Sequence, residues 1–197
     1  MDPILKRIAT AMTVVMLVTL ALIFTLSGTH VAAGTGGNAP APRLTAATTA
    51  AKVVNVKLFI NVNGPHGWPT YTLSKLNIPD NSIVHLTIIN NDNGGGTLAG
   101  PFGHAEGIIG LERVNGKATV VSSSNIAHTF TVPALGLNIV IPASPNNGVV
   151  TVQATFKVTK AGNYRWQCMA PCGTGSTGWG GPMATVGYMT GLFNVEN

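Results

Sequence analysis

Apolar and polar residues alternate along the stretch VVTVQATFKV, residues 149–158. In an extended chain, one face of this stretch carries Val150, Val152, Ala154, Phe156 and Val158. Successive side chains of a β-strand point to opposite faces, so a strand with one buried face has this period of two. The stretch therefore predicts a β-strand that packs its apolar face on a core.

The same alternation recurs through residues 52–197, between clusters of Gly, Pro and Asn. Further apolar faces are formed by Val54, Val56, Leu58 and Ile60, and by Val84, Leu86 and Ile88. Shorter strands are expected at Ala118–Ser122, Ile126–Val132, Leu137–Ile141, Asn163–Cys168 and Tyr188–Val195. Many short strands separated by turn residues predict an all-β sandwich or barrel. Two long glycine-rich stretches, Asn93–Gly107 and Gly173–Gly181, are expected to be loops that are either functional or mobile.

The composition excludes several classes of protein. Charged residues make up 9% of the chain, against roughly 25% in typical soluble proteins. This scarcity excludes charge-rich coiled coils, helical bundles and acidic or basic tails. The net charge is +5, but the 11 basic residues form no cluster. A nucleic-acid partner is therefore not expected, because binding to phosphates requires a basic stripe.

Residues 8–26 contain no charged side chain and follow Lys6 and Arg7. At about 1.5 Å per residue, such a segment is long enough to cross the hydrocarbon core as a helix. The preceding basic pair favours a cytoplasmic N-terminus, which places the rest of the chain outside the cell membrane. We expect a single-pass anchor at 1–26, a flexible linker at 27–51 and a folded domain at 52–197. The alternative is a signal peptide cleaved near residues 31–33; either segment exports the domain.

Candidate chemistry is concentrated in three places near the end of the chain. His128 lies in the predicted strand IAHTFTVP, on the face that also carries Phe130. Cys168 and Cys172 are separated by three residues. In an exported domain they could form a disulfide, or they could act as two thiolates that hold a soft metal, chiefly copper, together with histidine and methionine. Met183 follows the second glycine-rich stretch, and its thioether could be a weak copper ligand.

Two motifs in this order are specific: His128-x-Phe-x-Val-Pro-x-Leu-Gly-Leu, and then Tyr164-x-x-Gln-Cys-x-x-x-Cys-Gly. Over about Ser122–Val195 the chain resembles subunit II of the haem–copper terminal oxidases. The resemblance implies a cupredoxin-like Greek-key β-sandwich on a membrane anchor. It also implies a binuclear copper centre that passes electrons to the haem-bearing subunit I. By resemblance, His128, Cys168, Cys172 and Met183 fall on copper ligands.

The chain departs from the family pattern Cys-x-x-x-Cys-x-x-x-His-x-x-Met. Ser176 stands in the histidine slot and Trp179 in the methionine slot, and no histidine follows Cys172. His104, within the first glycine-rich stretch, is a candidate replacement ligand if both long loops lie at the same end of the sandwich.

Three functions remain open. The first is a subunit II-like, archaeal-type electron-transfer subunit. Its partners would be subunit I, other membrane subunits, and a donor that is a quinol, a cytochrome or a blue copper protein. The second is a quinol-oxidase subunit II without copper, in which the domain is structural. The third is a mononuclear blue-copper carrier resembling sulfocyanin. Hydrolytic or nucleophilic catalysis is not expected. The sequence shows no Ser/His/Asp arrangement, no paired carboxylates and no phosphate-binding loop.

Overall fold

The computed structural model describes residues 50–146, 148–172 and 179–197. The predicted anchor at 1–26 and nearly all of the predicted linker at 27–51 lie outside these residues. No helix within the described ranges is long and apolar enough to cross a bilayer. The described chain folds into two β-sheets, which confirms the predicted all-β class. The first strand of the described chain begins at Lys52.

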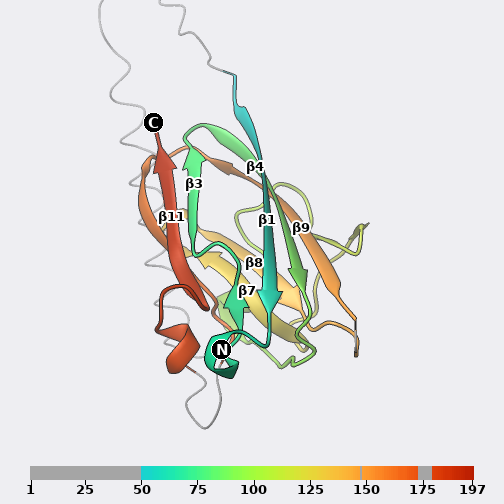
Figure 1. The fold of residues 1–197 in the computed structure, drawn as a ribbon. Coiled ribbons are helices and arrows are strands. Elements are labelled where there is room, and N and C mark those ends of the chain that lie inside the picture. Colours follow the sequence, from blue (N-terminus) through green and yellow to red (C-terminus); the bar gives the residue numbers. More distant parts are fainter. Residues whose placement is uncertain (1–49, 147, 173–178) are drawn as a thin grey trace, which may run out of the picture. The chain divides into compact units, whose positions relative to one another are not determined.

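The first sheet has the strand order β2-β1-β4-β9-β5-β6 (Figure 1). Its strands are β1 (Lys52–Asn61), β2 (Thr70–Tyr71), β4 (Ser82–Asn90), β5 (Arg113–Val114), β6 (Lys117–Ala118) and β9 (Val150–Val158). β1 and β4 are parallel, whereas β4 and β9 are antiparallel. The parallel pair requires the chain to leave the sheet between β1 and β4, because parallel neighbours need a crossover connection.

The second sheet has the order β3-β11-β10-β7-β8. Its strands are β3 (Lys75–Pro79), β7 (Ile126–Val132), β8 (Leu137–Pro142), β10 (Gly162–Gln167) and β11 (Thr190–Glu196). Among the described residues, four short 3-10 turns connect strands: η1 (Pro65–Gly67), η2 (Gly100–Gly103), η3 (Pro133–Leu135) and η4 (Gly181–Met183). Between β1 and β4 the chain contributes β3 to this second sheet, so the chain passes from one layer to the other and back.

The core lies between the two sheets. β9 buries all five apolar residues of its predicted face and leaves the intervening residues more exposed. The second sheet contributes an aromatic cluster in which the Phe130 and Trp166 rings stack at 5.4 Å between centroids. Phe193 joins the layers, with its ring 6.3 Å from that of Phe156 on β9. These contacts explain the alternation in the sequence, since each strand turns one face towards the other layer.

β7 is buried along its whole length, on both faces. One face packs in the core, and the other is covered by the chain that follows β4. That segment makes a bridge from Gly96 to Ile126 and another from Glu106 to Asn138. The Asn138 side chain also donates to the carbonyls of Phe102 and His104, at 3.1 and 2.6 Å. The first glycine-rich stretch therefore forms a cover over β7 and β8.

Two predicted strands differ from the observed ones. The strand expected at Ala118–Ser122 is confined to Lys117–Ala118, and Val120 is 76% exposed. Pairing ends there because β6 is an edge strand whose partner β5 is only two residues long, although Val121 is still buried in the core. The last strand begins at Thr190 instead of Tyr188. Tyr188 belongs to the preceding turn, where its N–H donates to the carbonyl of Thr185.

Candidate metal centre

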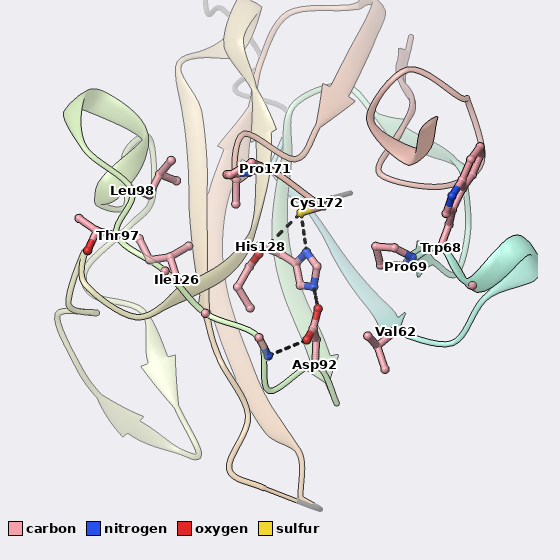
Figure 2. A pocket seen from close by; sticks show the side chains of 16 residues that line it. Val62, Trp68, Pro69, Asp92, Thr97, Leu98, Ile126, His128, Pro171 and Cys172 are labelled. Atoms are coloured by element: carbon pink, nitrogen blue, oxygen red, sulfur yellow. Dashed lines mark hydrogen bonds and ion pairs between the residues drawn. The ribbon is translucent and has the colours of Figure 1, made fainter. Parts of the chain in front are cut away.

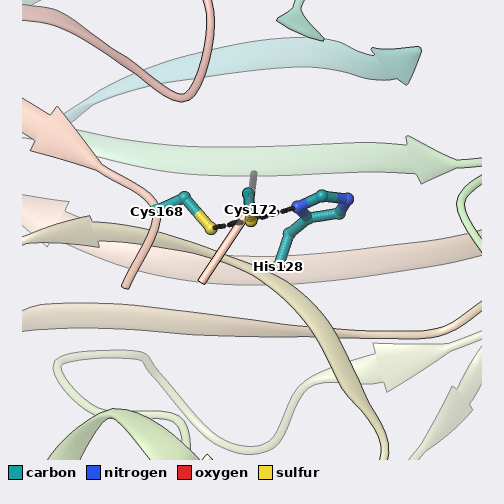
Figure 3. A group of neighbouring side chains, drawn as sticks. All are labelled: His128, Cys168 and Cys172. Carbon is teal, nitrogen blue, oxygen red and sulfur yellow. Dashed lines mark hydrogen bonds between the residues drawn. The ribbon is translucent and has the colours of Figure 1, made fainter. Parts of the chain in front are cut away.

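His128, Cys168 and Cys172 form a compact buried cluster (Figure 3). His128 Nδ1 lies 3.0 Å from Cys172 Sγ and 3.9 Å from Cys168 Sγ, and the two sulfur atoms are 3.1 Å apart. The histidine is contributed by β7, whereas both cysteines follow β10. The structure thus brings together three of the five residues expected as metal ligands. Their ligand atoms all lie within 4.8 Å of one another, a spacing that can hold a metal ion.

The backbone of β7 fixes the cysteine loop. Thr129 donates its backbone N–H to Cys168 Sγ at 3.3 Å, and its side-chain Oγ1 accepts the N–H of Met169 at 2.7 Å. Cys168 itself donates its N–H to the carbonyl of Met189 at 2.8 Å. The start of the loop is therefore tied to two neighbouring chain segments.

The cluster is almost completely shielded from water, with His128 at 1% and Cys168 at 0% exposure. Burial raises the pKa of Cys168, but hydrogen bonds with Cys172 and His128 outweigh burial and hold that pKa well below its usual value. The hydrogen bond to Cys168, together with burial, raises the pKa of Cys172. These two directions favour a thiolate at Cys168 that accepts the S–H of Cys172, 3.1 Å away. This is an anionic sulfur site suited to a soft cation.

The protonation of His128 depends on the same neighbours. Burial by itself lowers the pKa of His128, but hydrogen bonds to Asp92 and Cys168 raise it to about 9. An imidazolium held between a thiolate and a carboxylate is favoured electrostatically. A metal ion bound at Nδ1 would replace the proton on that nitrogen, because a ligating histidine must be neutral.

Asp92 completes the site and was not singled out from the sequence. Its Oδ2 lies 3.0 Å from His128 Nε2, and its Oδ1 accepts the N–H of Gly94 at 2.7 Å (Figure 2). Burial raises the pKa of Asp92, but the hydrogen bonds with His128 and Gly94 outweigh burial and lower it. The sequence offered only a weak indication of this role: Asp92 is one of the few carboxylates in the chain and stands just before a glycine-rich stretch. Its contact with a histidine on a distant strand is not visible in the sequence.

His104 does not join the cluster. Its side chain is 57% exposed, and its Nε2 pairs with Glu106 Oε1 at 2.9 Å. The prediction assumed that the first glycine-rich stretch would turn this imidazole towards the cysteines. Instead, the backbone around His104 is bound by the Asn138 side chain, and the imidazole pairs with the adjacent carboxylate at the surface. Within the described ranges, His128 is the one histidine of the cluster.

Met183 is buried in η4, and its carbonyl accepts from Gln167 Nε2 at 3.4 Å. Gln167 immediately precedes Cys168, so the Met183 backbone lies beside the strand that carries the first cysteine. Its role as an axial ligand stays a prediction. Ser176, in the histidine slot of the family pattern, is outside the described residues, and Trp179 is exposed at the surface.

A cavity of about 420 Å³ opens beside the cluster (Figure 2). Asp92, His128 and Cys172 contribute to its wall. The rest of the wall is mostly apolar or glycine, and includes Trp68 and Leu98. The cluster is therefore buried in protein, yet one side of it borders a space that a small ion can enter.

No family model matches the chain, and no curated protein matches it. Among solved structures the chain is similar to reduced rusticyanin, with 20% identity, coverage of 75% of this chain and 82% of that one, and a TM-score of 0.40. It is also similar to rusticyanin from Thiobacillus ferrooxidans, with 20% identity over 75% and 79% of the two chains and a TM-score of 0.39. For auracyanin B the identity is 12%, the coverage 73% and 89%, and the TM-score 0.37.

Proposed function

We propose that this chain is an exported, copper-binding electron-transfer domain of the cupredoxin type that serves as the subunit II-like part of a respiratory terminal oxidase. The observation that carries the proposal is the pair of buried sulfur atoms, 3.1 Å apart, with one imidazole nitrogen 3.0 Å from the second sulfur. Thiolate and imidazole are donors that suit copper. Cys168, Cys172 and His128 would hold the copper, with Met183 as a further ligand.

The donor set fits copper chemically. Because the pKa of Cys168 is lowered, this thiol can lose its proton without a separate base in the buried site, and the thiolate is the form that binds a metal. When bound, copper supplies one-electron redox chemistry. The protein's own contribution is to keep the ligands in one arrangement: β7 binds both the sulfur and the loop of Cys168, and burial excludes water. A rigid arrangement of ligands needs little rearrangement when the charge of the ion changes.

Two adjacent cysteines favour the binuclear form of the site over the mononuclear one. A blue-copper centre uses two histidines, one cysteine and a weak axial ligand. Here a second sulfur lies 3.1 Å from the first, whereas a mononuclear centre uses one cysteine. This donor set supports a subunit II-like domain rather than a sulfocyanin-like carrier. We further propose, from residues 8–26 and the motif resemblance, a single-pass membrane location and haem-bearing subunit I as the partner.

A second candidate is the copper-free quinol-oxidase form of the same subunit. The observation in its favour is that His104 lies away from the cluster, so the described residues supply fewer imidazoles than the family's binuclear centre uses. In that case the two neighbouring thiols would serve as a structural disulfide in the oxidising exterior.

The test is the copper content and visible absorption of the full chain, purified in detergent, reduced and then loaded with copper. Two coppers with a purple, mixed-valence spectrum would support the binuclear proposal, and one copper with an intense blue band would support the mononuclear carrier. Failure of the reduced chain to retain copper, with a Cys168–Cys172 disulfide found by mass spectrometry in the chain before reduction, would overturn the proposal in favour of the copper-free form. His128→Ala is expected to lose or alter the spectrum. The matched control is His85→Ala, since His85 is exposed on β4 and bonds to Thr155.

A further inference from the structure

Asp92 lies two residues beyond the end of β4, at the start of the cover formed by the first glycine-rich stretch. Its carboxylate is 16% exposed and uses both oxygens. Oδ1 accepts the N–H of Gly94 at 2.7 Å, and Oδ2 faces His128 Nε2 at 3.0 Å. One carboxylate thus binds the backbone two residues further along the chain and contacts a histidine on β7.

The backbone of Asp92 is held by a fully buried asparagine. Asn90 accepts the N–H of Asp92 with its Oδ1 at 2.9 Å and donates from Nδ2 to the Asp92 carbonyl at 3.1 Å. The same Nδ2 donates to the carbonyl of Pro142 at the end of β8, also at 3.1 Å. Ser144 adds its own N–H to the Asp92 carbonyl at 2.8 Å. The carboxylate therefore projects from a segment that is fixed to both sheets.

A histidine can ligate a metal through either ring nitrogen, and the hydrogen bond made by the other nitrogen decides which one. Here the ionised carboxylate of Asp92 can only accept, so Nε2 must carry the hydrogen. Nδ1, on the other side of the ring, faces the two sulfur atoms. If the imidazole were flipped by 180°, ring carbons would replace Nε2 beside the carboxylate and Nδ1 beside the sulfurs, so both contacts would be lost.

We propose that Asp92, held in place by Asn90, is a positioning residue of the metal centre: it binds the Nε2–H of His128 and thereby presents the Nδ1 lone pair to copper held by Cys168 and Cys172. This inference rests on the proposed function. Loss of a comparable carboxylate partner of a ligating histidine typically costs about 10–100-fold in metal affinity. Asp92 does not itself contact the metal in this proposal.

The probe is Cu(I), added to the reduced full chain in competition with a coloured chelator. Asp92→Ala is expected to weaken Cu(I) binding by about 10–100-fold. The matched control is Asp80→Ala: Asp80 lies beyond the opposite end of β4, where it pairs with Lys52 at 4.0 Å, and its loss is expected to leave the affinity unchanged. Asp92→Asn serves as a second variant of nearly equal shape, with a smaller loss in the same direction, should the alanine variant fold poorly.

A double-mutant cycle separates positioning from general destabilisation. If Asp92 acts through the imidazole, Asp92→Ala has no further effect in a chain that already carries His128→Ala. An equal loss in both backgrounds would overturn the inference, because the effect would then not pass through His128. If the wild type binds Cu(I) and Asp92→Ala binds it as tightly, the inference about Asp92 is overturned but the proposed function is not. Wild-type chain that does not bind Cu(I) would overturn the proposed function, and the role of Asp92 towards copper with it.

Nuclear magnetic resonance provides a readout that does not depend on affinity, since Cu(I) is diamagnetic. In the Cu(I)-loaded wild type, the His128 Nε2–H should give a slowly exchanging, strongly deshielded signal. This signal should be lost from Asp92→Ala and retained in Asp80→Ala. Persistence of the signal in Asp92→Ala would contradict the inference.

Discussion

The side-chain oxygen of Thr129 accepts the backbone N–H of Met169 at 2.7 Å. This bond joins the middle of β7 to the loop between the two cysteines. The Thr129 hydroxyl also bonds to the Thr131 hydroxyl at 2.8 Å, and the Thr131 O–H donates to Asn138 Oδ1 at 2.6 Å. Asn138 binds the cover formed by residues of the first glycine-rich stretch. One buried polar chain therefore connects the cysteine loop with that cover, through the face of β7 that is turned away from the core.

Thr129→Val should leave the partly buried N–H of Met169 without its acceptor. Such a group costs about 1–3 kcal/mol, so the urea midpoint of the metal-free protein should fall while the slope of the transition stays unchanged. Thr151→Val, on the less buried face of β9, is the control and should change the stability by less than about 0.5 kcal/mol. Equal effects of the two substitutions would contradict the role assigned to this hydroxyl.

Glu112 should make the domain less stable as the pH rises. Its side chain is buried, with Oε1 accepting the N–H of Val140 at 2.8 Å, and burial raises its pKa from 4.5 to about 7. Between these two values the folded state binds more protons than the unfolded state. The contribution of this group is therefore most favourable below pH 4.5 and is lost as the pH rises through 7. The full effect is at most about 3 kcal/mol.

The measurement is the free energy of unfolding across the acidic to neutral range for the wild type and for Glu112→Gln. The amide oxygen of Gln can still accept from Val140, so this variant should lack the loss of stability between pH 4.5 and 7. Glu106→Gln, at the exposed carboxylate beside His104, is the control. Parallel pH profiles for the wild type and Glu112→Gln would show that the Glu112 carboxyl titrates normally in the folded protein.

Gly191 should not tolerate a side chain. It pairs with Trp166 across β10 and β11, and a Cβ at this position would collide with the Ser74 carbonyl oxygen and lie 2.5 Å from Trp166 Nε1. Overpacking of this kind typically costs about 1–3 kcal/mol, and sometimes more. Gly191→Ala should therefore lower the thermal midpoint by several degrees. Gly96→Ala, where an added Cβ would meet no atom within 4 Å, should have little effect. A similar fall in the thermal midpoint for Gly96→Ala would show that the loss at Gly191 is not caused by the lack of space.

Copper removal should lower the stability of the domain, on the proposed function. A ligand that binds only the folded state adds RT ln(1 + [L]/Kd) to the free energy of unfolding, about 2.7 kcal/mol at a hundredfold excess over Kd. The thermal midpoint of the reduced chain should rise on addition of Cu(I) and fall again with a chelator. The double variant Cys168→Ser with Cys172→Ser should show neither change. A rise of equal size in this variant would place the copper elsewhere.

Much of the fold could be predicted from the sequence because strand patterning is local. The alternation in β4 and β9 reports which face of each strand is buried, and β7 and β9 were predicted at or within a residue of their observed bounds. The proximity of His128 to the two cysteines was also expected, because the resemblance places all three on copper ligands. The structure brings their ligand atoms within 4.8 Å of one another, and their binding of a metal stays a prediction.

The remaining features depend on which segments the tertiary fold brings together. Asp92 and His128 are far apart in the sequence and meet because the segment after β4 is fixed against the end of β8. His104 lies in the same cover yet faces the surface, because Asn138 binds its backbone and Glu106 its imidazole. A residue pattern determines where a strand forms and which face is apolar. The partner of a polar side chain in a long loop is decided by contacts with distant segments. The alternation of apolar and polar residues within one segment does not indicate such contacts.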